Sequence, residues 1–587
     1  MIIDKVNNPG DLKNLTFQEC DELAEEIRQL LLQKASEKGG HLGSNLGMIE
    51  ASIALHYVFN SPKDKIIFDV SHQCYTHKIL TGRKEGFTCP QKYDLYSGYT
   101  NPNESEHDQF RVGHTSTSIS LACGMAKARD LKGEKENIIA IIGDGSLSGG
   151  EAFEGLDYGG SELNSNLIII FNDNQMSIAE NHGGIYKNIQ HLRETNGLAK
   201  NNFFKTLGYD YVFVKNGNDI SSLVKAFRSV QDIDHPVVVH ICTQKGKGYW
   251  YSEQYQEQTH WVRPFDKETG EERRPFNGER YDRIVRDYLM EKMEKDPRVV
   301  TMIAAVPDAL AFSPEKRKEI GKQIIDVGIA EEHAISMAAG IAHNGGKPVF
   351  STLATFYQRT YDQISQELCI NKEPAVLIVV NASVYAPNDI THIGIFDIAM
   401  MSNIPNLVYL APTNKQEYLS MLEWAIDQEE WPVAIRAPRN GVFNAKGTVD
   451  TDYSKLNKYE KVIEGEKIAI IALGDFFQLG EELAVNIIER YGFSPTLINP
   501  RYITGVDEEM LRNLTLNHKL VITLEDGIIE GGFGEKIANF YGTEKILVKT
   551  YGLKKKFIDR YNIDDMLKEN HLRPELIIKD IDELKIN

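Results

Sequence analysis

Short apolar runs alternate with helix-compatible stretches along almost the whole chain. The runs are rich in Val and Ile and apolar on both faces, as central strands of parallel sheets are. They lie at residues 137–143, 166–174, 236–243, 347–356, 374–383, 406–413, 432–439, 467–475, 518–527 and 545–552. Stretches between them, such as 480–492, suit helices that cover a sheet. This alternation predicts an α/β fold of doubly wound parallel sheets, divided among several domains.

Two polar, turn-rich stretches interrupt the alternation, at residues 245–280 and 439–467. We interpret both as linkers. A chain of 587 residues is also too long for one hydrophobic core, which favours several domains. The sequence therefore predicts domains at residues 1–275, 281–445 and 460–587.

The charge balance narrows the classes of partner. With 65 basic and 84 acidic residues, the formal net charge of −19 argues against a nucleic-acid partner or an anionic membrane surface. No apolar run approaches the roughly 18 residues of a membrane span, and the first residues lack the features of a signal peptide. The six cysteines show no CxxC pair. They are typical of reduced thiols, so we expect a cytoplasmic protein without a zinc site.

A glycine–aspartate turn, Gly143-Asp144-Gly145, ends the first apolar run, at residues 137–143. A dinucleotide-binding motif would need a third glycine where Ser148 stands, and the chain has no P-loop sequence. A diphosphate held through Mg²⁺ would explain the carboxylate, because carboxylate oxygens are hard ligands for this ion. Gly145 would then let the backbone approach the phosphates closely.

The next apolar run along the chain supplies further oxygen ligands. Asn174 follows it, 30 positions after Asp144, and the backbone carbonyl of Met176 lies two residues further on. Asp144, Asn174 and Met176 are therefore the predicted metal ligands. The alternative that remains open is an ordinary strand-to-helix turn with an aspartate capping the helix.

Together, Asp144 and Asn174 resemble the thiamine-diphosphate motif of transketolase-like enzymes. Other stretches narrow the resemblance to the 1-deoxy-D-xylulose-5-phosphate synthase family: residues 68–83, 112–128, 171–181, 326–342, 355–363, 391–397 and 498–511. The resemblance covers almost the whole chain, in order. It implies three doubly wound parallel-sheet domains of transketolase-like architecture: a diphosphate- and Mg²⁺-binding domain (1–275), a pyrimidine-binding domain (281–445) and a transketolase C-terminal-like domain (460–587).

A coenzyme of this kind needs a carboxylic acid against its pyrimidine ring, in a desolvated site that raises the pKa of the acid. Glu331 and Glu332 both follow an apolar run and open a helix. From the residues alone either could serve, and both could simply complement the helix dipole. The resemblance selects Glu331 as the catalytic carboxylate. It also implies Phe356 as an aromatic wall for the pyrimidine, with Arg359 nearby.

Five of the sixteen histidines lie in glycine-rich or motif-rich loops. An isolated loop histidine is more often structural than catalytic. By resemblance, however, His41, His260 and His392 face the reacting carbon as catalytic residues. The resemblance places the following residues on the coenzyme: His72, Gly113, His114, Thr115, Gly145, Ser146, Asn174, Tyr249, Glu331, Phe356 and Arg359.

The implied reaction is the thiamine-diphosphate-dependent condensation of pyruvate, with loss of CO₂, and glyceraldehyde 3-phosphate to give 1-deoxy-D-xylulose 5-phosphate. Arg439 is the candidate for the phosphate of the acceptor, because a guanidinium suits bidentate phosphate contacts. His392 is also expected to contact substrate. A homodimer is expected from the resemblance as well.

The substrate pocket is where the chain departs from the family pattern. Leu353 stands in place of a tyrosine, Asn381 of an arginine, Asn388 of an aspartate and Ile393 of a histidine. Two alternatives therefore stay open. One is a transketolase-type two-carbon transferase with a different donor or acceptor. The other is a coenzyme-binding protein without catalysis, against which the intact Asp144, Asn174 and Glu331 argue.

Overall fold

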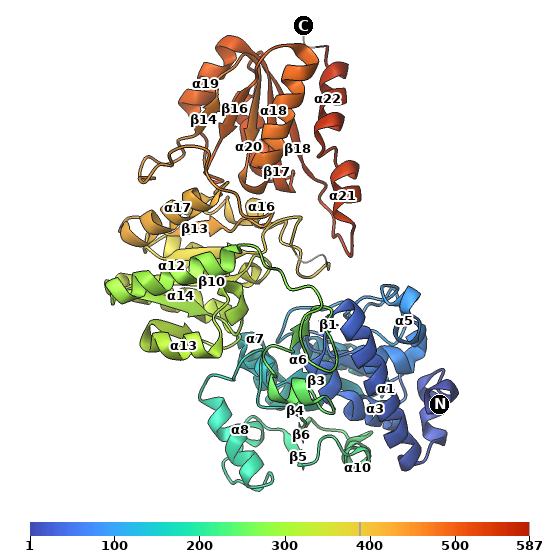
Figure 1. The fold of residues 1–587 in the computed structure, drawn as a ribbon. Helices are drawn as coiled ribbons and strands as arrows, with labels where there is room; N and C mark the ends of the chain where they lie inside the picture. The colour runs from blue at the N-terminus through green and yellow to red at the C-terminus, as the bar shows by residue number, and fades with distance from the viewer. Residues whose placement is uncertain (387–388, 586–587) are drawn as a thin grey trace. The chain divides into compact units, whose positions relative to one another are not determined.

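The computed structural model describes residues 1–386 and 389–585 and has an α/β fold with three main sheets, as the sequence predicts (Figure 1). The chain forms two compact units. Unit 1 comprises Met1–Asn277 with Gly328–Ala330, and unit 2 comprises Gly278–Val327 with Glu331–Asn587. The division into three domains stays a prediction. Among the described residues, no helix combines the length and the apolar character needed to cross a bilayer.

Unit 1 is built on a parallel five-stranded sheet of order β2-β3-β4-β6-β5. Its strands are β2 (Lys65–Phe68), β3 (Ile138–Gly143), β4 (Ile168–Asp173), β5 (Asp210–Val214) and β6 (Val237–Cys242). Its helices are α1 (Phe17–Lys38), α2 (Gly43–Gly47), α3 (Ile49–Val58), α4 (Tyr75–Lys78), α5 (Glu85–Thr88), α6 (Ser118–Lys132), α7 (Gly150–Ser161), α8 (Ile185–Glu194), α9 (Phe203–Thr206), α10 (Ile220–Val230) and α11 (Trp250–Gln254). The apolar residues of α1, α3 and α10 cover one face, and those of α6 to α9 cover the other. The sheet is therefore doubly wound, which explains why its central strands are apolar on both faces.

The stretch predicted as the first linker is largely folded into unit 1. It contains α11 and the short strand β7 (Trp261–Val262), which pairs antiparallel with β1 (Gly40–His41). Tyr249 and Phe265 are buried in the apolar core of the unit. The polar composition misled the prediction because aromatic anchors and a few buried polar side chains, Lys245, Ser252 and Thr259, hold the segment in the unit, while most of its other side chains are exposed or partly exposed.

The first sheet of unit 2 has six parallel strands in the order β12-β13-β11-β10-β8-β9. They are β8 (Val299–Ile303), β9 (Ile324–Asp326), β10 (Lys347–Leu353), β11 (Val376–Val380), β12 (Val408–Leu410) and β13 (Val433–Arg436). The helices are α12 (Tyr281–Lys295), α13 (Pro314–Ile320), α14 (Glu331–His343), α15 (Tyr361–Gln363), α16 (Asp397–Met401) and α17 (Lys415–Asp427). Helices α12 and α17 pack on one face, and α14 and α16 pack on the other.

The second sheet of unit 2 has the order β14-β16-β15-β17-β18. Its strands are β14 (Glu460–Ile463), β15 (Lys467–Ala472), β16 (Thr496–Asn499), β17 (His518–Ile528) and β18 (Leu547–Leu553), and its helices are α18 (Phe477–Tyr491), α19 (Glu508–Asn517), α20 (Phe533–Tyr541), α21 (Ile563–Glu569) and α22 (Pro574–Glu583). Only β14 is antiparallel; it lies at the edge and is partly exposed. An antiparallel edge strand tolerates this exposure, whereas the inner parallel strands are buried on both faces. Part of the second predicted linker is thus an edge strand.

A buried ionic cluster joins the two sheets of unit 2. The Nε of Arg436 donates to Asp397 at 2.8 Å, and its guanidinium also donates to Asp526 on β17. The hydroxyl of Tyr409 donates to the same Asp397 carboxylate. All four side chains are buried, so each carboxylate depends on these hydrogen bonds for its stability in the interior.

Candidate active site

Several predicted site residues meet at the carboxyl ends of the parallel strands of unit 1. His72 follows β2, Asp144 follows β3, Asn174 follows β4, and the segment that contains Lys245 follows β6. These strands are neighbours in the sheet. The carboxyl edge of a doubly wound parallel sheet is where such folds bind their ligands.

Asp144 is a buried carboxylate whose charge the nearby Lys245 only partly offsets. Its Oδ2 accepts a hydrogen bond from Nδ2 of Asn181 at 2.8 Å, and the side chain is 1% exposed. Burial raises the pKa of Asp144 well above its ordinary value, and the negative charge of Asp173 raises it further. A divalent cation at this carboxylate would remove that penalty, so the donor chemistry fits the predicted metal.

The loop after β4 presents the other predicted ligands next to Asp144. Strands β3 and β4 pair in register, with Gly143 opposite Asn172, so Asp144 and Asn174 emerge at neighbouring strand ends. The Oδ1 of Asn174 accepts a hydrogen bond from the backbone N–H of Met176 at 3.1 Å. This turn places an amide oxygen and a backbone carbonyl within one short loop.

Lys245 is a site residue that the sequence interpretation missed. Its Nζ donates to the backbone carbonyls of Ser177, at 2.6 Å, and Ile178, at 3.3 Å. Burial lowers the pKa of Lys245 to about 8, against the opposing effect of the Asp144 charge. The signal was a Lys-Gly-Lys-Gly sequence that begins three residues after an apolar strand, but it fell in the segment interpreted as a linker.

Three of the predicted histidines form a cluster in unit 1. The ring centroid of His41 lies 4.9 Å from that of His72 and 5.5 Å from that of His260. The ring centroids of His72 and His260 are 5.1 Å apart. Pairing of β1 with β7 brings His41 beside His260, and Nδ2 of Asn45 donates to the carbonyls of His41 and His72 at 2.9 and 2.8 Å. Burial and then the positive charge of Lys245 hold the pKa of His260 well below its ordinary value. The His260 ring is therefore neutral near pH 7.

The loop with Gly113, His114 and Thr115 is held from the end of β2. Asp69 accepts hydrogen bonds from the backbone N–H of Ser116 at 2.8 Å and of Ser118 at 3.0 Å. The Ser116 hydroxyl donates to the carbonyl of Ser146 at 2.8 Å, which links this loop to the turn after β3. Sequence reasoning missed Asp69, whose role is visible only through these contacts.

Gly145 and Ser146 lie in a short 3₁₀ turn, η5 (Gly145–Ser148), that separates the glycine–aspartate turn from α7. A Cβ at Gly145 would come within 2.8 Å of Ser177, so close packing of two loops also requires this glycine. The ring of Tyr249 is buried in the core, and its hydroxyl donates to the carbonyl of Lys267 at 3.0 Å. Its predicted contact with the coenzyme stays a prediction.

In unit 2 the two candidate glutamates differ in burial. Glu331 opens α14 and is 3% exposed, whereas Glu332 is partly exposed. Among the described residues, Oε2 of Glu331 has no hydrogen-bond partner. Burial raises the pKa of Glu331 to about 7, although the nearby positive charge of Arg359 acts to lower it. A buried acid with an unused oxygen fits a group that binds a ring nitrogen of a ligand.

The turn after β10, η8 (Phe356–Thr360), carries Phe356 and Arg359. The ring of Phe356 lies edge-on to that of His392, with centroids 5.6 Å apart. The Nδ1 of His392 is 3.1 Å from a carboxylate oxygen of Asp389. Asn388, which stands at the family's aspartate position, lies outside the described residues, but its neighbour Asp389 brings a carboxylate to this histidine.

The other substrate positions lie at the same sheet edge. Leu353 and Asn381 are at the carboxyl ends of the paired strands β10 and β11. Arg439 follows β13 and is exposed, and its backbone N–H donates to both carboxylate oxygens of Asp475 at 2.9 Å. Ile393 is 1% exposed within an apolar cluster, so this replacement is buried. The substrate contacts of these residues stay predictions.

Comparison with protein families matches most of the chain, in three parts. The profile described as 1-deoxy-D-xylulose-5-phosphate synthase matches residues 3–201 and 195–243. The pyrimidine-binding domain of transketolase matches 280–443, and the transketolase C-terminal domain matches 457–577.

Curated relatives match over nearly their full length. The 1-deoxy-D-xylulose-5-phosphate synthase of Caldanaerobacter subterraneus subsp. tengcongensis is 37% identical, over 98% of this chain and 98% of that protein. The enzyme of the same name from Alkaliphilus oremlandii is 38% identical, again over 98% of both chains. That of Halalkalibacterium halodurans is 35% identical over 100% of this chain and 99% of its own. The chain belongs to the 1-deoxy-D-xylulose-5-phosphate synthase family.

Proposed function

We propose that the protein condenses pyruvate, with loss of CO₂, and glyceraldehyde 3-phosphate to 1-deoxy-D-xylulose 5-phosphate, using thiamine diphosphate and Mg²⁺. The observation that carries this proposal is Glu331, a buried acid with a raised pKa and an oxygen that has no partner among the described residues. Such a group suits the pyrimidine of the coenzyme. The family assignment supplies the substrates.

The residues that would hold the coenzyme and metal have suitable chemistry. Asp144, Asn174 and the carbonyl of Met176 would bind Mg²⁺, as hard oxygen ligands. His72, the loop 113–115 and the turn at 145–146 would bind the diphosphate. When bound, the coenzyme supplies an electron sink at the carbon that loses CO₂.

The chain's own residues would manage protons and charge around the reacting atoms. Glu331, with a pKa of about 7, can hold or release a proton near neutral pH. His260 is neutral, and within the described ranges its Nδ1 has no hydrogen-bond partner. This nitrogen is therefore able to form a hydrogen bond with a substrate oxygen. Lys245 retains its proton below a pH of about 8 and would favour anionic oxygens nearby.

The acceptor would be oriented by Arg439 and by the His392–Asp389 pair. The alternative of a two-carbon transferase rests on the replacements at Leu353, Asn381 and Asn388. Relatives named as synthases over the full chain favour the synthase. Assembly as a homodimer is proposed from the resemblance, and sedimentation velocity would test it.

The reaction is tested directly with purified protein, pyruvate, glyceraldehyde 3-phosphate, Mg²⁺ and thiamine diphosphate. We expect CO₂ and 1-deoxy-D-xylulose 5-phosphate in equal amounts, with both substrates required. Absence of CO₂ release from pyruvate would reject the proposal. Turnover of xylulose 5-phosphate without consumption of pyruvate would establish the two-carbon transferase instead.

Replacing Arg439 by Ala is expected to raise the KM for glyceraldehyde 3-phosphate about 10- to 100-fold, because a charge-assisted phosphate contact contributes about 1.5–3 kcal/mol. The KM for pyruvate should stay within about twofold of the wild type, and Arg439→Lys should recover part of the loss. Steady-state kinetics with each substrate varied in turn measures this. Arg512→Ala, at an exposed arginine of the same unit, is the control. Equal effects on both KM values would argue against a phosphate contact.

A further inference from the structure

A second buried carboxylate, Asp173, stands directly before the predicted metal ligand Asn174. It is the last residue of β4 and is 2% exposed. Its Oδ2 lies 2.9 Å from Nε2 of His240 on β6 and 2.5 Å from a guanidinium nitrogen of Arg193 on α8. A buried carboxylate with two such partners is firmly fixed in place.

His240 extends this network across the sheet. Its Nδ1 is 2.7 Å from the hydroxyl of Tyr211 on β5. The ionised carboxylate of Asp173 can only accept, so Nε2 of His240 carries the proton, and in the neutral ring Nδ1 accepts from Tyr211. Tyr211, His240, Asp173 and Arg193 therefore form one chain of hydrogen bonds over three strands and a helix.

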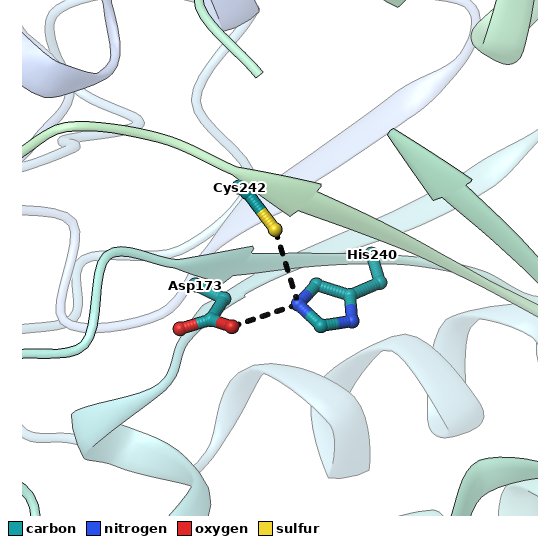
Figure 2. Close-up of side chains that lie close together, drawn as sticks. All are labelled: Asp173, His240 and Cys242. Atoms are coloured by element: carbon teal, nitrogen blue, oxygen red, sulfur yellow. Dashed lines mark hydrogen bonds and ion pairs between the residues drawn. The ribbon is translucent and has the colours of Figure 1, made fainter. Parts of the chain in front are cut away.

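The same cluster could at first be taken for a metal site. Figure 2 shows Asp173 and Cys242 both near the ring of His240, and the ligand atoms of the three residues lie within 4.8 Å of one another. However, the Nε2 of His240 is occupied by its hydrogen bond to Asp173, and Arg193 already balances the Asp173 charge. Burial also raises the pKa of the Cys242 thiol to about 12, which disfavours the thiolate that binds metals. The cluster is better explained by its effect on the adjoining loop.

The second carboxylate oxygen of Asp173 contacts the turn that follows, whose Gln175 N–H also bonds to Asp144. This oxygen, Oδ1, accepts a hydrogen bond from the backbone N–H of Gln175 at 3.2 Å. Gln175 has φ of +68°, a left-handed conformation that a residue with a side chain rarely adopts. The next backbone N–H, that of Met176, bonds to the side chain of Asn174. Asp173 thus helps to hold the conformation in which Asn174 and Met176 present their oxygens.

We propose that Asp173, fixed by His240 and Arg193, is a positioning residue for the cation site formed by Asp144, Asn174 and Met176. It orders the turn before the cation binds, so the residues that bind the cation lose less conformational entropy on binding. The inference rests on the proposed function, because the cation site is itself a proposal. It gives Asp173, the central residue of Asn172-Asp173-Asn174, a role other than that of a metal ligand.

The test measures binding of Mn²⁺ to the full-length protein with thiamine diphosphate present, by the electron paramagnetic resonance signal of free Mn²⁺. Asp173→Asn is expected to raise the Kd for Mn²⁺ about 10- to 100-fold, the usual cost of losing an outer partner of a metal site. The kcat at saturating Mg²⁺ should stay within about threefold of the wild type, because the ligands remain.

Two further variants keep the test decisive if Asp173→Asn does not fold. Arg193→Met removes a partner that is 22% exposed and should raise the Kd about 10-fold, whereas Arg193→Lys should restore most of the affinity. The matched control is Asp210→Asn, which removes the carboxylate of an exposed aspartate–histidine pair on β5, with His235 at 2.7 Å.

The outcomes separate this inference from the proposed function. Wild-type affinity for Mn²⁺ in folded Asp173→Asn or Arg193→Met overturns the positioning role if Asp144→Asn still abolishes binding. If Asp144→Asn also binds Mn²⁺ like the wild type, the cation site itself is wrongly assigned. A raised Kd in the Asp173 and Arg193 variants, with an unchanged Kd in Asp210→Asn, supports the inference.

Discussion

Replacing Glu331 by Gln is expected to lower turnover about 10²- to 10⁴-fold, the usual contribution of a positioned acid–base group. The amide preserves the shape of the side chain but cannot exchange a proton. CO₂ release from pyruvate measures the loss. Glu332→Gln, at the partly exposed neighbour, should retain turnover within about twofold.

The same variant has an opposite effect on stability, which separates catalysis from folding. The pKa of Glu331 is raised by burial from 4.5 to about 7, so its contribution to stability is present below pH 4.5 and is lost as the pH rises through about 7. At pH 8 the Gln variant should therefore be more stable than the wild type, by up to about 3 kcal/mol. Denaturant unfolding of both proteins at pH 4.5 and pH 8 measures this. Full activity in Glu331→Gln, or equal loss in Glu332→Gln, would contradict the assignment.

Replacing Asp144 by Asn is expected to raise the Mg²⁺ concentration needed for half-maximal activity. The increase should exceed the roughly 10- to 100-fold effect of losing a residue that only supports a metal ligand. The reason is that Asp144 supplies the only charged ligand in the predicted set. Titration of activity with Mg²⁺ after removal of metal by a chelator measures the shift, and coenzyme binding at low Mg²⁺ should fall with it.

Asp157→Asn serves as the control, because this exposed aspartate lies on α7 of the same strand–helix unit. It should leave the Mg²⁺ dependence unchanged. A wild-type response in Asp144→Asn would mean that the carboxylate only caps the turn, which was the alternative left open by its sequence.

The sequence predicts the sheets well because their central strands are buried on both faces. The continuous apolar runs at 137–143 and 518–527, for example, form the strands β3 and β17. It does not reveal the pairing of the short strands β1 and β7, which depends on contacts between distant segments. That pairing places His41 beside His260, so the histidine cluster could be expected from the resemblance but not from the pattern of polar residues.

The two adjacent glutamates show a second limit of the sequence. Glu331 and Glu332 have the same chemistry and the same helix N-terminus, and only their different burial distinguishes them. Lys245 was missed for a related reason: composition suggested a connecting segment, whereas the lysine is 1% exposed. Side-chain burial is a property of the folded chain, and local sequence determines it poorly.

The ionic cluster around Arg436 has a consequence for how this chain could be recombined with its relatives. The cation belongs to β13, but one of its carboxylates, Asp526, belongs to β17. Joining residues 460–587 to a first part that lacks this arginine would leave Asp526 buried without the guanidinium that now balances its charge. Losing one partner of a buried pair costs about 3–5 kcal/mol, a large part of the stability of a typical domain. A chimaera joined between residues 445 and 460 would therefore have to inherit the arginine and both aspartates together.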